Sequence, residues 1–191
     1  MRAGLRKVLG RFGASEGGNA VVEGVMMLPV MLMAWLGLFA FWEGFSSRSA
    51  VQEAAFVAAD LLSREVVPVS DAFLDGLDNT VEYLVGQRFN VSTRFTSFSR
   101  TGTLDTDVAV NWSYSPGSAM AAMTSAQLVA KAAQLPKLAV GSTAIISETT
   151  MAYSTPFSVP IASYVVPASF SDMVVLRPRF LAKVCRAGIA C

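Results

Sequence analysis

Hydrophobic residues follow three successive patterns along this chain, and each pattern predicts a different kind of element. Residues 24–42 contain no charged side chain. A helix of that length covers about 28 Å at 1.5 Å per residue, which is close to the thickness of about 30 Å of a bilayer's hydrocarbon core. The first pattern therefore predicts a helix that can cross a membrane.

The second pattern has the period of an α-helix. Residues 43–65 are rich in Ala, Leu, Glu and Gln, so we expect the membrane helix to continue through them until Pro68 ends it. A stripe along this part should face either the chain's own domain or a neighbouring subunit. The stripe consists of Val51, Ala54, Ala55, Ala58, Leu61 and Leu62.

A second helix is expected over residues 71–85. Ser70 is a good N-terminal cap for it, and Gly86 ends it.

The third pattern alternates apolar and polar side chains, as in a half-buried strand. The alternation is clearest over residues 108–115, where Val108, Val110, Trp112 and Tyr114 share one side, and an earlier run covers residues 89–95. RTGT at residues 100–103 is short enough to join the two runs as a hairpin.

The rest of the chain predicts a further helix and a second pair of strands. Residues 119–135 have helix composition, and strands are expected over residues 144–153 and 173–184. Pro178 makes the last strand an edge strand or splits it. The predicted fold class is α+β: an N-terminal transmembrane helix continues into an exterior helix, which packs with further helices on a small antiparallel sheet.

Charge predicts the orientation of the span. Four basic residues precede it, Arg2, Arg6, Lys7 and Arg11, and only Glu16 opposes them. Positive flanks stay in the cytoplasm. We therefore expect a basic cytoplasmic leader (residues 1–18), a transmembrane helix (19–45) and an exterior α+β domain (46–191). A secretory signal peptide is the alternative, but Arg48 occupies the position where a cleavage site needs a small residue.

Composition argues against several classes of function. Basic and acidic side chains balance over residues 44–191, so no nucleic-acid partner is expected. The chain contains no His and no phosphate-binding glycine loop, so we expect no enzyme, cofactor or small-molecule substrate. An exterior hydrolase with a Ser–Lys pair stays as an alternative without a motif. Asp105 and Asp107 lie on one side of a predicted strand without further oxygen ligands, so no metal is expected.

Both cysteines lie at the C-terminal end of the sequence. Cys185 and Cys191 are six positions apart. In an oxidising compartment they can close a small loop by a disulfide, and two free thiols are the alternative.

Glu23 lies at the N-terminal edge of the apolar run. A cut after Gly18 would make Asn19 the new N-terminus and Glu23 the fifth residue. Glu23 would then lie one helical turn from the new α-ammonium, and in staggered chains it would neutralise the ammonium of a neighbour. The alternative is an ordinary carboxylate at the membrane surface. Pro29 removes a backbone donor and allows the span to bend, as it would also do in a plain kinked anchor.

The motif GNAVVEG at residues 18–24, followed by an apolar run with Pro29 inside it, resembles the N-terminal signature of TadE-like proteins. These are pseudopilins, or minor pilins, of the tight-adherence (Flp, type IVb) pilus system. FGASEGG at residues 12–18, GSTAIISETTMAYSTPF at residues 141–157 and VLRPRF at residues 175–180 also resemble that family, so the likeness runs through most of the chain.

The resemblance implies a non-enzymatic pilus assembly component in the bacterial inner membrane, with a periplasmic domain. It implies a prepilin peptidase that cuts between Gly18 and Asn19, and a requirement for Glu23 in assembly. Its partners would be other pilins and pseudopilins and the Tad secretion complex. The family tends to carry Tyr directly after the Glu, where this chain has Gly24. The alternative is an uncleaved single-span anchor subunit of the secretion complex.

Overall fold

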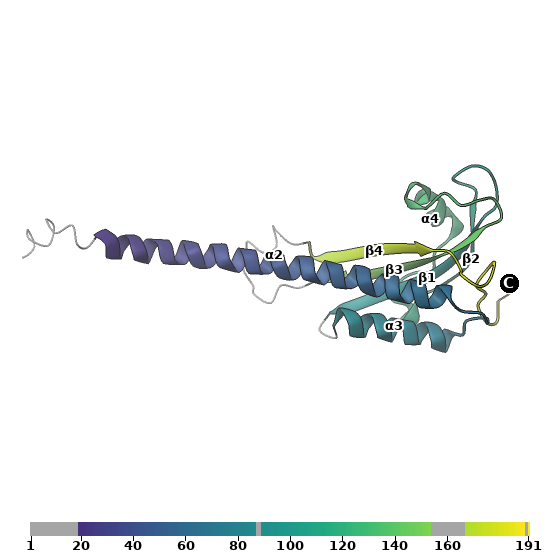
Figure 1. Cartoon of the computed structure of the whole chain (residues 1–191), viewed down its shortest axis with the longest axis horizontal. Helices are drawn as coiled ribbons and strands as arrows, with labels where there is room; N and C mark the ends of the chain where they lie inside the picture. Colours follow the sequence, from purple (N-terminus) through teal and green to yellow (C-terminus); the bar gives the residue numbers. More distant parts are fainter. Residues whose placement is uncertain (1–18, 87–88, 154–166, 190) are drawn as a thin grey trace, which may run out of the picture.

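The computed structural model describes residues 19–86, 89–153, 167–189 and 191. It confirms the predicted fold class: a long N-terminal apolar helix projects from an α+β domain with a four-stranded antiparallel sheet (Figure 1). The leader, residues 1–18, and the connection over residues 154–166 lie outside the described residues. The elements are α2 (Asn19–Ser63), α3 (Asp71–Val85), β1 (Asn90–Arg100), β2 (Val108–Tyr114), α4 (Ser125–Ala130), β3 (Thr143–Ala152) and β4 (Ser169–Leu176), with short 3-10 turns η2 (Pro116–Ser118) and η3 (Ala132–Gln134).

The first helix, α2, is one element of 45 residues that includes Pro29. At 1.5 Å per residue it is about 68 Å long. It ends at Ser63 rather than at Pro68, so the expected end was wrong. The reason is a contact with a distant segment: the Ser63 carbonyl accepts a hydrogen bond from the Arg179 amide at 2.9 Å, and the chain leaves the helix through a turn.

The second helix, α3, has the predicted bounds and caps. The Ser70 hydroxyl accepts from the Phe73 amide at 3.2 Å, and Gly86 ends the helix with a φ of 104°, which side chains rarely adopt. Its buried residues are Leu74, Leu77, Val81 and Val85.

The strands form one sheet in the order β2-β1-β3-β4, with every neighbouring pair antiparallel. The register between β1 and β2 shifts after Ser97, which pairs with Trp112, whereas Phe98 pairs with Val110. Asn111 is therefore the extra residue of a bulge, and Trp112 and Val110 face opposite sides of the sheet. The prediction of one continuous half-buried face on β2 was wrong for this reason.

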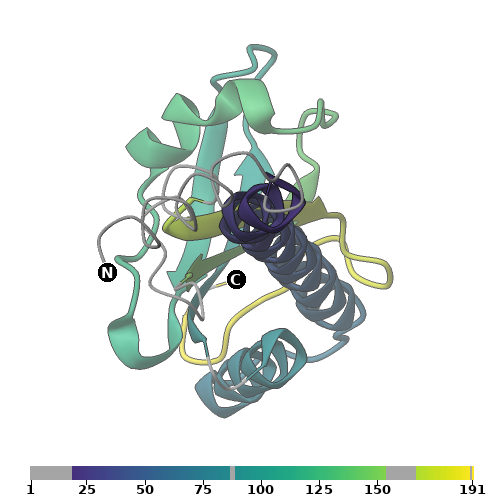
Figure 2. The same cartoon turned by 90° about the vertical axis from the view of Figure 1, so that its left-hand side faces the viewer.

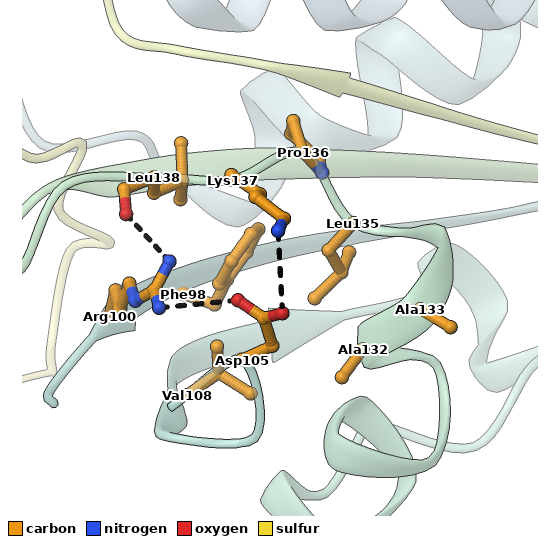
Figure 3. Close-up of a pocket in the computed structure, with 10 residues that line it drawn as sticks. All are labelled: Phe98, Arg100, Asp105, Val108, Ala132, Ala133, Leu135, Pro136, Lys137 and Leu138. Carbon is orange, nitrogen blue, oxygen red and sulfur yellow. Dashed lines mark hydrogen bonds and ion pairs between the residues drawn. The ribbon is translucent and has the colours of Figure 1, made fainter. Parts of the chain in front are cut away.

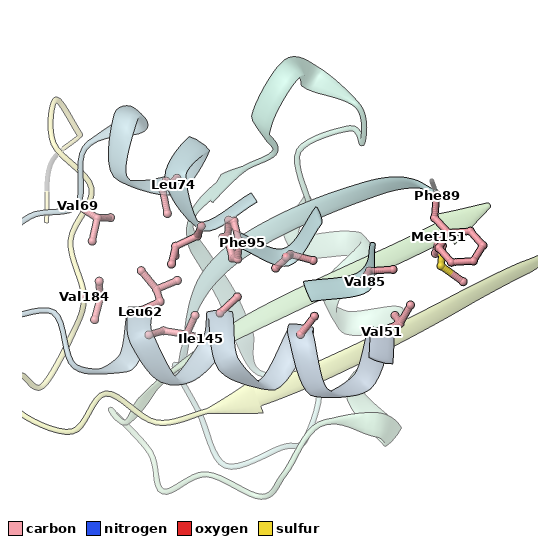
Figure 4. Packing of buried hydrophobic residues seen from close by; sticks show 14 of the residues in the cluster. Val51, Leu62, Val69, Leu74, Val85, Phe89, Phe95, Ile145, Met151 and Val184 are labelled. Carbon is pink, nitrogen blue, oxygen red and sulfur yellow. The ribbon is translucent and has the colours of Figure 1, made fainter. Parts of the chain in front are cut away.

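Apolar clusters cover both faces of the sheet. The larger joins α2 and α3 to one face and includes Val51, Leu62, Phe95 and Ile145 (Figure 4). The smaller lies on the other face, where Phe98 and Ile146 meet Leu128 of α4. Figure 2 shows α2 and α3 beside each other on one side of the sheet and α4 on the other.

Two predicted segments differ from the structure. The helix expected over residues 119–135 is reduced to α4 and η3, because the amides of Met120 and Met123 bond to the hydroxyls of Ser115 and Ser113. The last strand is Ser169–Leu176 rather than residues 173–184. It is an edge strand, as Pro178 led us to expect.

The connection between β1 and β2 is longer than RTGT alone. Residues 101–107 form a loop around the Arg100 guanidinium, which donates to the carbonyls of Gly102 and Thr103. Asp105 and Asp107 belong to this loop and not to a strand, so that prediction was wrong.

Candidate functional site

The protruding half of α2 is the main candidate site. Over residues 21–39 its large apolar side chains, apart from the half-buried Leu36, are exposed around the helix; Met26, Val30 and Met31, for example, are 70%, 61% and 72% exposed. Among the described residues α2 is the one helix long and apolar enough to cross a membrane. A helix that is apolar all round and has no core of its own requires lipid or other protein chains around it.

The predicted assembly residues lie at the start of this half. Gly18 is outside the described residues, whereas Asn19 is the first residue of α2. Glu23 is exposed and lies one turn after Asn19 on the same face of the helix. Gly24 has open space around it, so no neighbouring atom within the described part of the chain requires glycine there. Pro29 lies inside the helix without ending it.

Packing against the domain begins before the apolar run ends. Along α2 the buried positions start at Ala40 and continue through Ser47, Val51 and Ala54 to Leu62. On the opposite side Phe41, Trp42 and Phe45 are 58%, 71% and 62% exposed. Trp and Tyr are enriched where a span meets water, and Trp42 fits that place. The sequence analysis missed these junction aromatics, although Phe and Trp at the end of the apolar run are a signal for them.

The predicted stripe beyond this junction packs on the chain's own domain. Val51, Ala54, Ala55, Ala58 and Leu62 are all 1% exposed or less. Leu61 is 42% exposed and does not belong to the stripe, whereas Ala59 is buried and does. The position of Leu61 on the helix turns it away from the sheet.

The C-terminal segment closes the far end of the domain. Cys185 and Cys191 are joined by a disulfide with Cα atoms 5.3 Å apart. The Val69 amide donates to the Cys185 carbonyl at 2.9 Å, and the Trp112 indole N–H donates to the Val184 carbonyl at 2.9 Å. The disulfide therefore holds a segment that is hydrogen-bonded both to the start of α3 and to the sheet.

Charged groups strengthen this closure. The Arg186 guanidinium lies 2.8 Å from the Asp71 carboxylate and 4.4 Å from the centre of the Tyr114 ring. Its hydrogen bond holds the pKa of Asp71 below the usual range, and the same contact raises the pKa of Arg186. The hydrogen bond from the Tyr114 hydroxyl to Asp75, at 2.8 Å, raises the pKa of that phenol.

A buried ion cluster lies beneath α4. The Arg94 Nε donates to Glu148 Oε2 at 2.6 Å, Lys131 contacts Glu148 Oε1, and Arg94 also donates to the Ala121 carbonyl. Glu148 is 3% exposed and Arg94 is 9% exposed. Sequence reasoning missed this cluster, since its members come from separate elements. It ties the irregular segment before α4 to β1 and β3.

A small pocket lies between the second apolar cluster and the loop after β1 (Figure 3). Phe98, Val108 and Leu135 line its apolar side, and Arg100 holds Asp105 at 3.2 Å and the Leu138 carbonyl at 2.8 Å. Lys137 lies 4.0 Å from the same carboxylate. Two cations, Arg100 and Lys137, therefore already lie close to Asp105. Among the described residues, no group of three His, Cys, Asp or Glu side chains could hold a metal ion.

Comparison with family models, curated proteins and solved structures finds no match to this chain.

Proposed function

We propose that this protein is a non-enzymatic, TadE-like pseudopilin that acts in the assembly of Flp-type (type IVb) adhesive pili. The observation that carries the proposal is Glu23 at the tip of the protruding half of α2. It is the only charged side chain from Asn19 to Trp42, and it lies one turn from the residue that a prepilin peptidase would expose. An ammonium on a neighbouring subunit is a favourable partner for it in lipid, where an unpaired carboxylate is costly.

The architecture supports this role. The protruding half needs lipid around it before assembly and neighbouring helices afterwards, and van der Waals packing of helices can replace lipid contacts at little cost. The α+β domain is attached rigidly through the same helix, so a subunit that moves out of the membrane carries its domain with it.

In this proposal the protein is a single-pass protein of the bacterial inner membrane. The basic leader stays in the cytoplasm and the α+β domain lies in the periplasm. A disulfide between Cys185 and Cys191 suits that oxidising compartment. Its partners are sister pseudopilins, the Tad secretion complex and the prepilin peptidase.

Two measurements in piliated cells test the proposal. Glu23→Ala should leave membrane insertion unchanged and strongly reduce the number of pili, whereas Glu23→Asp should restore part of the assembly. Glu53→Ala is the matched control, because Glu53 is an exposed carboxylate on the domain half of the same helix. Wild-type piliation with Glu23→Ala would overturn the role of Glu23.

Mass spectrometry of the mature protein separates this role from that of an uncleaved anchor. A chain that begins at Asn19 in cells with an active prepilin peptidase supports processing. A chain that begins at Met1 in those cells favours an anchor subunit of the secretion complex.

A further inference from the structure

Two loops meet at the end of the molecule opposite the protruding half of α2 (Figure 1). One follows α2 and the other follows β4. The Arg179 amide donates to the Ser63 carbonyl at 2.9 Å, and the Val69 amide donates to the Cys185 carbonyl at 2.9 Å. Residues 63–69 and 179–185 therefore lie side by side and run in the same direction, joined at both ends.

Large apolar side chains are exposed on both loops. Their exposed fractions range from 37% to 68%. At the base of the loops Val69 and Val184 are buried in the main core, so both loops are anchored. Apolar side chains that gather on an anchored surface mark a contact with another molecule. The four exposed residues, which we call the distal patch, are Val66, Val67, Phe180 and Leu181.

The two long segments outside the described residues cannot reach the distal patch. The Thr143 hydroxyl donates to the Ala182 carbonyl, so β3 begins beside the patch and ends about 33 Å away. The connection over residues 154–166 starts at that far end and returns to it at β4. It spans at most about 50 Å, which is too short to reach the patch and come back. The leader of 18 residues spans at most about 65 Å, less than the length of α2.

Two fixed guanidiniums accompany the distal patch. Arg64 and Arg179 each lie 2.6 Å from an oxygen of the same Asp60 carboxylate. The Asp60 side chain is 18% exposed, whereas the two arginine side chains are 53% and 52% exposed. Each arginine contacts Asp60 through Nη2 and has further N–H donors for a ligand. The surroundings are cationic as well, since residues 173–191 carry four basic side chains and no acidic one.

This chemistry favours lipid over protein as the occupant. A second copy that docked patch to patch would bring the arginine pairs of both copies together, which like charges oppose. A stable protein contact buries about 800 Å² on each partner, and the distal patch has only four apolar side chains. Acyl chains need no matching groove, and phosphates are strong acceptors for guanidiniums.

We infer that the distal patch docks onto the surface of an anionic phospholipid bilayer. Phe180 and its apolar neighbours enter the acyl boundary, and Arg64 and Arg179 bind lipid phosphates. The end of α2 lies 21 residues beyond Trp42, or about 32 Å. This bilayer is therefore not the one that the protruding half would cross. The inference does not depend on a role in pilus assembly.

The test uses the full chain in nanodiscs of phosphatidylcholine, mixed with sucrose-loaded vesicles. Vesicles that contain phosphatidylglycerol should sediment the nanodiscs, and vesicles of phosphatidylcholine alone should bind far less. Added salt should weaken the binding, because it screens the charges. Equal binding to both kinds of vesicle, or binding to neither, would overturn the inference.

Matched variants locate the contact. Phe180→Ser should weaken binding about tenfold or more, whereas Tyr83→Ser, which removes a 75% exposed ring at the other end of α3, should not. Arg179→Gln should weaken binding about fivefold. Arg48→Gln, which removes an exposed cation at the other end of the packed half of α2, should leave binding unchanged. Unchanged binding with either patch variant would overturn the inference.

A probe in the patch tests insertion directly. Phe180→Trp places an indole there, and brominated phosphatidylglycerol in the added vesicles should quench its fluorescence. The wild type should show no quenching, because Trp112 is buried and Trp35 and Trp42 belong to the nanodisc end of α2. Binding without quenching would overturn insertion of the patch. Association of nanodiscs without vesicles, lost in Phe180→Ser, would show a second copy as the occupant and overturn the assignment to lipid.

Discussion

The two halves of α2 share one uninterrupted helix but have opposite distributions of side-chain size. The protruding half, before Ala40, exposes Val, Met, Leu and Trp in every direction. The packed half, from Ala40 to Ser63, buries Val51 and Leu62 but otherwise mostly small residues, including Ala54, Ala55, Ala58 and Ala59, and exposes large ones such as Phe45 and Phe56. In a soluble helix the large apolar residues would be the buried ones.

This difference indicates which contacts each half makes. Small side chains let the packed half approach the sheet closely, and the larger residues of α3 and the strands fill the space between them (Figure 4). The protruding half has no small-residue face that fits the domain, so its large residues serve contacts outside it. Helix continuity alone does not distinguish the two halves; side-chain size and burial do.

The largest expected effect is the loss of membrane insertion when a charge enters the protruding half. Met33→Lys places a cation near the middle of the apolar run, which costs about 3 kcal/mol on insertion scales. Phe56→Lys is the matched control, since Met33 and Phe56 are both 51% exposed. Alkaline extraction of membranes should release the first variant and retain the second. Equal release of both would mean that the two halves do not differ in environment.

The second largest effect is expected from a larger side chain in the packed half of α2. Ala58→Leu forces a larger side chain into the contact between α2 and the sheet and should destabilise the domain by about 1–3 kcal/mol. Ala34→Leu makes the same change at an exposed position of the protruding half and should leave the domain unaffected. Thermal unfolding in detergent, followed by near-ultraviolet circular dichroism, measures both. Equal Tm values for Ala58→Leu and the wild type would contradict close packing at Ala58.

Loss of the disulfide should destabilise the domain without changing the protruding half. Cys185→Ser removes a cross-link that restricts the unfolded chain, at a cost of about 2 kcal/mol for a loop this short. Membrane insertion should be unchanged, and reduced wild-type protein should unfold at the same temperature as the variant. If reductant does not change the Tm of the wild type, the cross-link does not contribute to stability.

The smallest expected effect concerns Asp78 on α3. Burial raises the pKa of this carboxyl, although the Thr93 hydroxyl donates to it at 2.6 Å and partly opposes the shift. The pKa of Asp78 in the folded protein exceeds the unfolded value of about 3.9. The free energy of unfolding therefore falls as pH rises from the unfolded pKa to the folded pKa, and it stays lower at higher pH. Asp78→Asn keeps an acceptor for Thr93 without the charge. It should raise Tm slightly at neutral pH and leave Tm unchanged at pH 3, where Asp78 is largely protonated.

Local signals were sufficient for several elements. Ser70 and Gly86 mark the two ends of α3, because the conformational preferences of capping residues act within a few residues. The bounds of β2 follow from the alternation of apolar and polar residues. The buried stripe on α2 was predicted as well, apart from Leu61 and Ala59. For the protruding half, the sequence predicted a helix able to span a membrane, with Glu23 and Pro29 inside it.

Features that depend on contacts between distant segments were not predictable in this way. The bulge at Asn111 places Val110 and Trp112 on opposite faces of the sheet, although apolar and polar residues alternate without a break along the sequence of β2. Ala-rich residues before α4 do not form a helix, because hydroxyls on Ser113 and Ser115 take their amides. From the sequence alone, the charged residues Arg94 and Glu148 would be expected on the surface. They become partners because β1 and β3 pair in the fold. The place of β4 at an edge of the sheet depends on the strand order of the whole sheet.

The alignment of α2 with the sheet also determines how the molecule would bear a mechanical load. The packed half lies along β3 and β4 rather than across them (Figure 1). Tension applied along the axis of the protruding half would therefore try to slide the helix past the strands, so that the contacts from Val51 to Leu62 share the force. A protein built in this way should resist extraction of its helix far better than one whose helix can be peeled from the end.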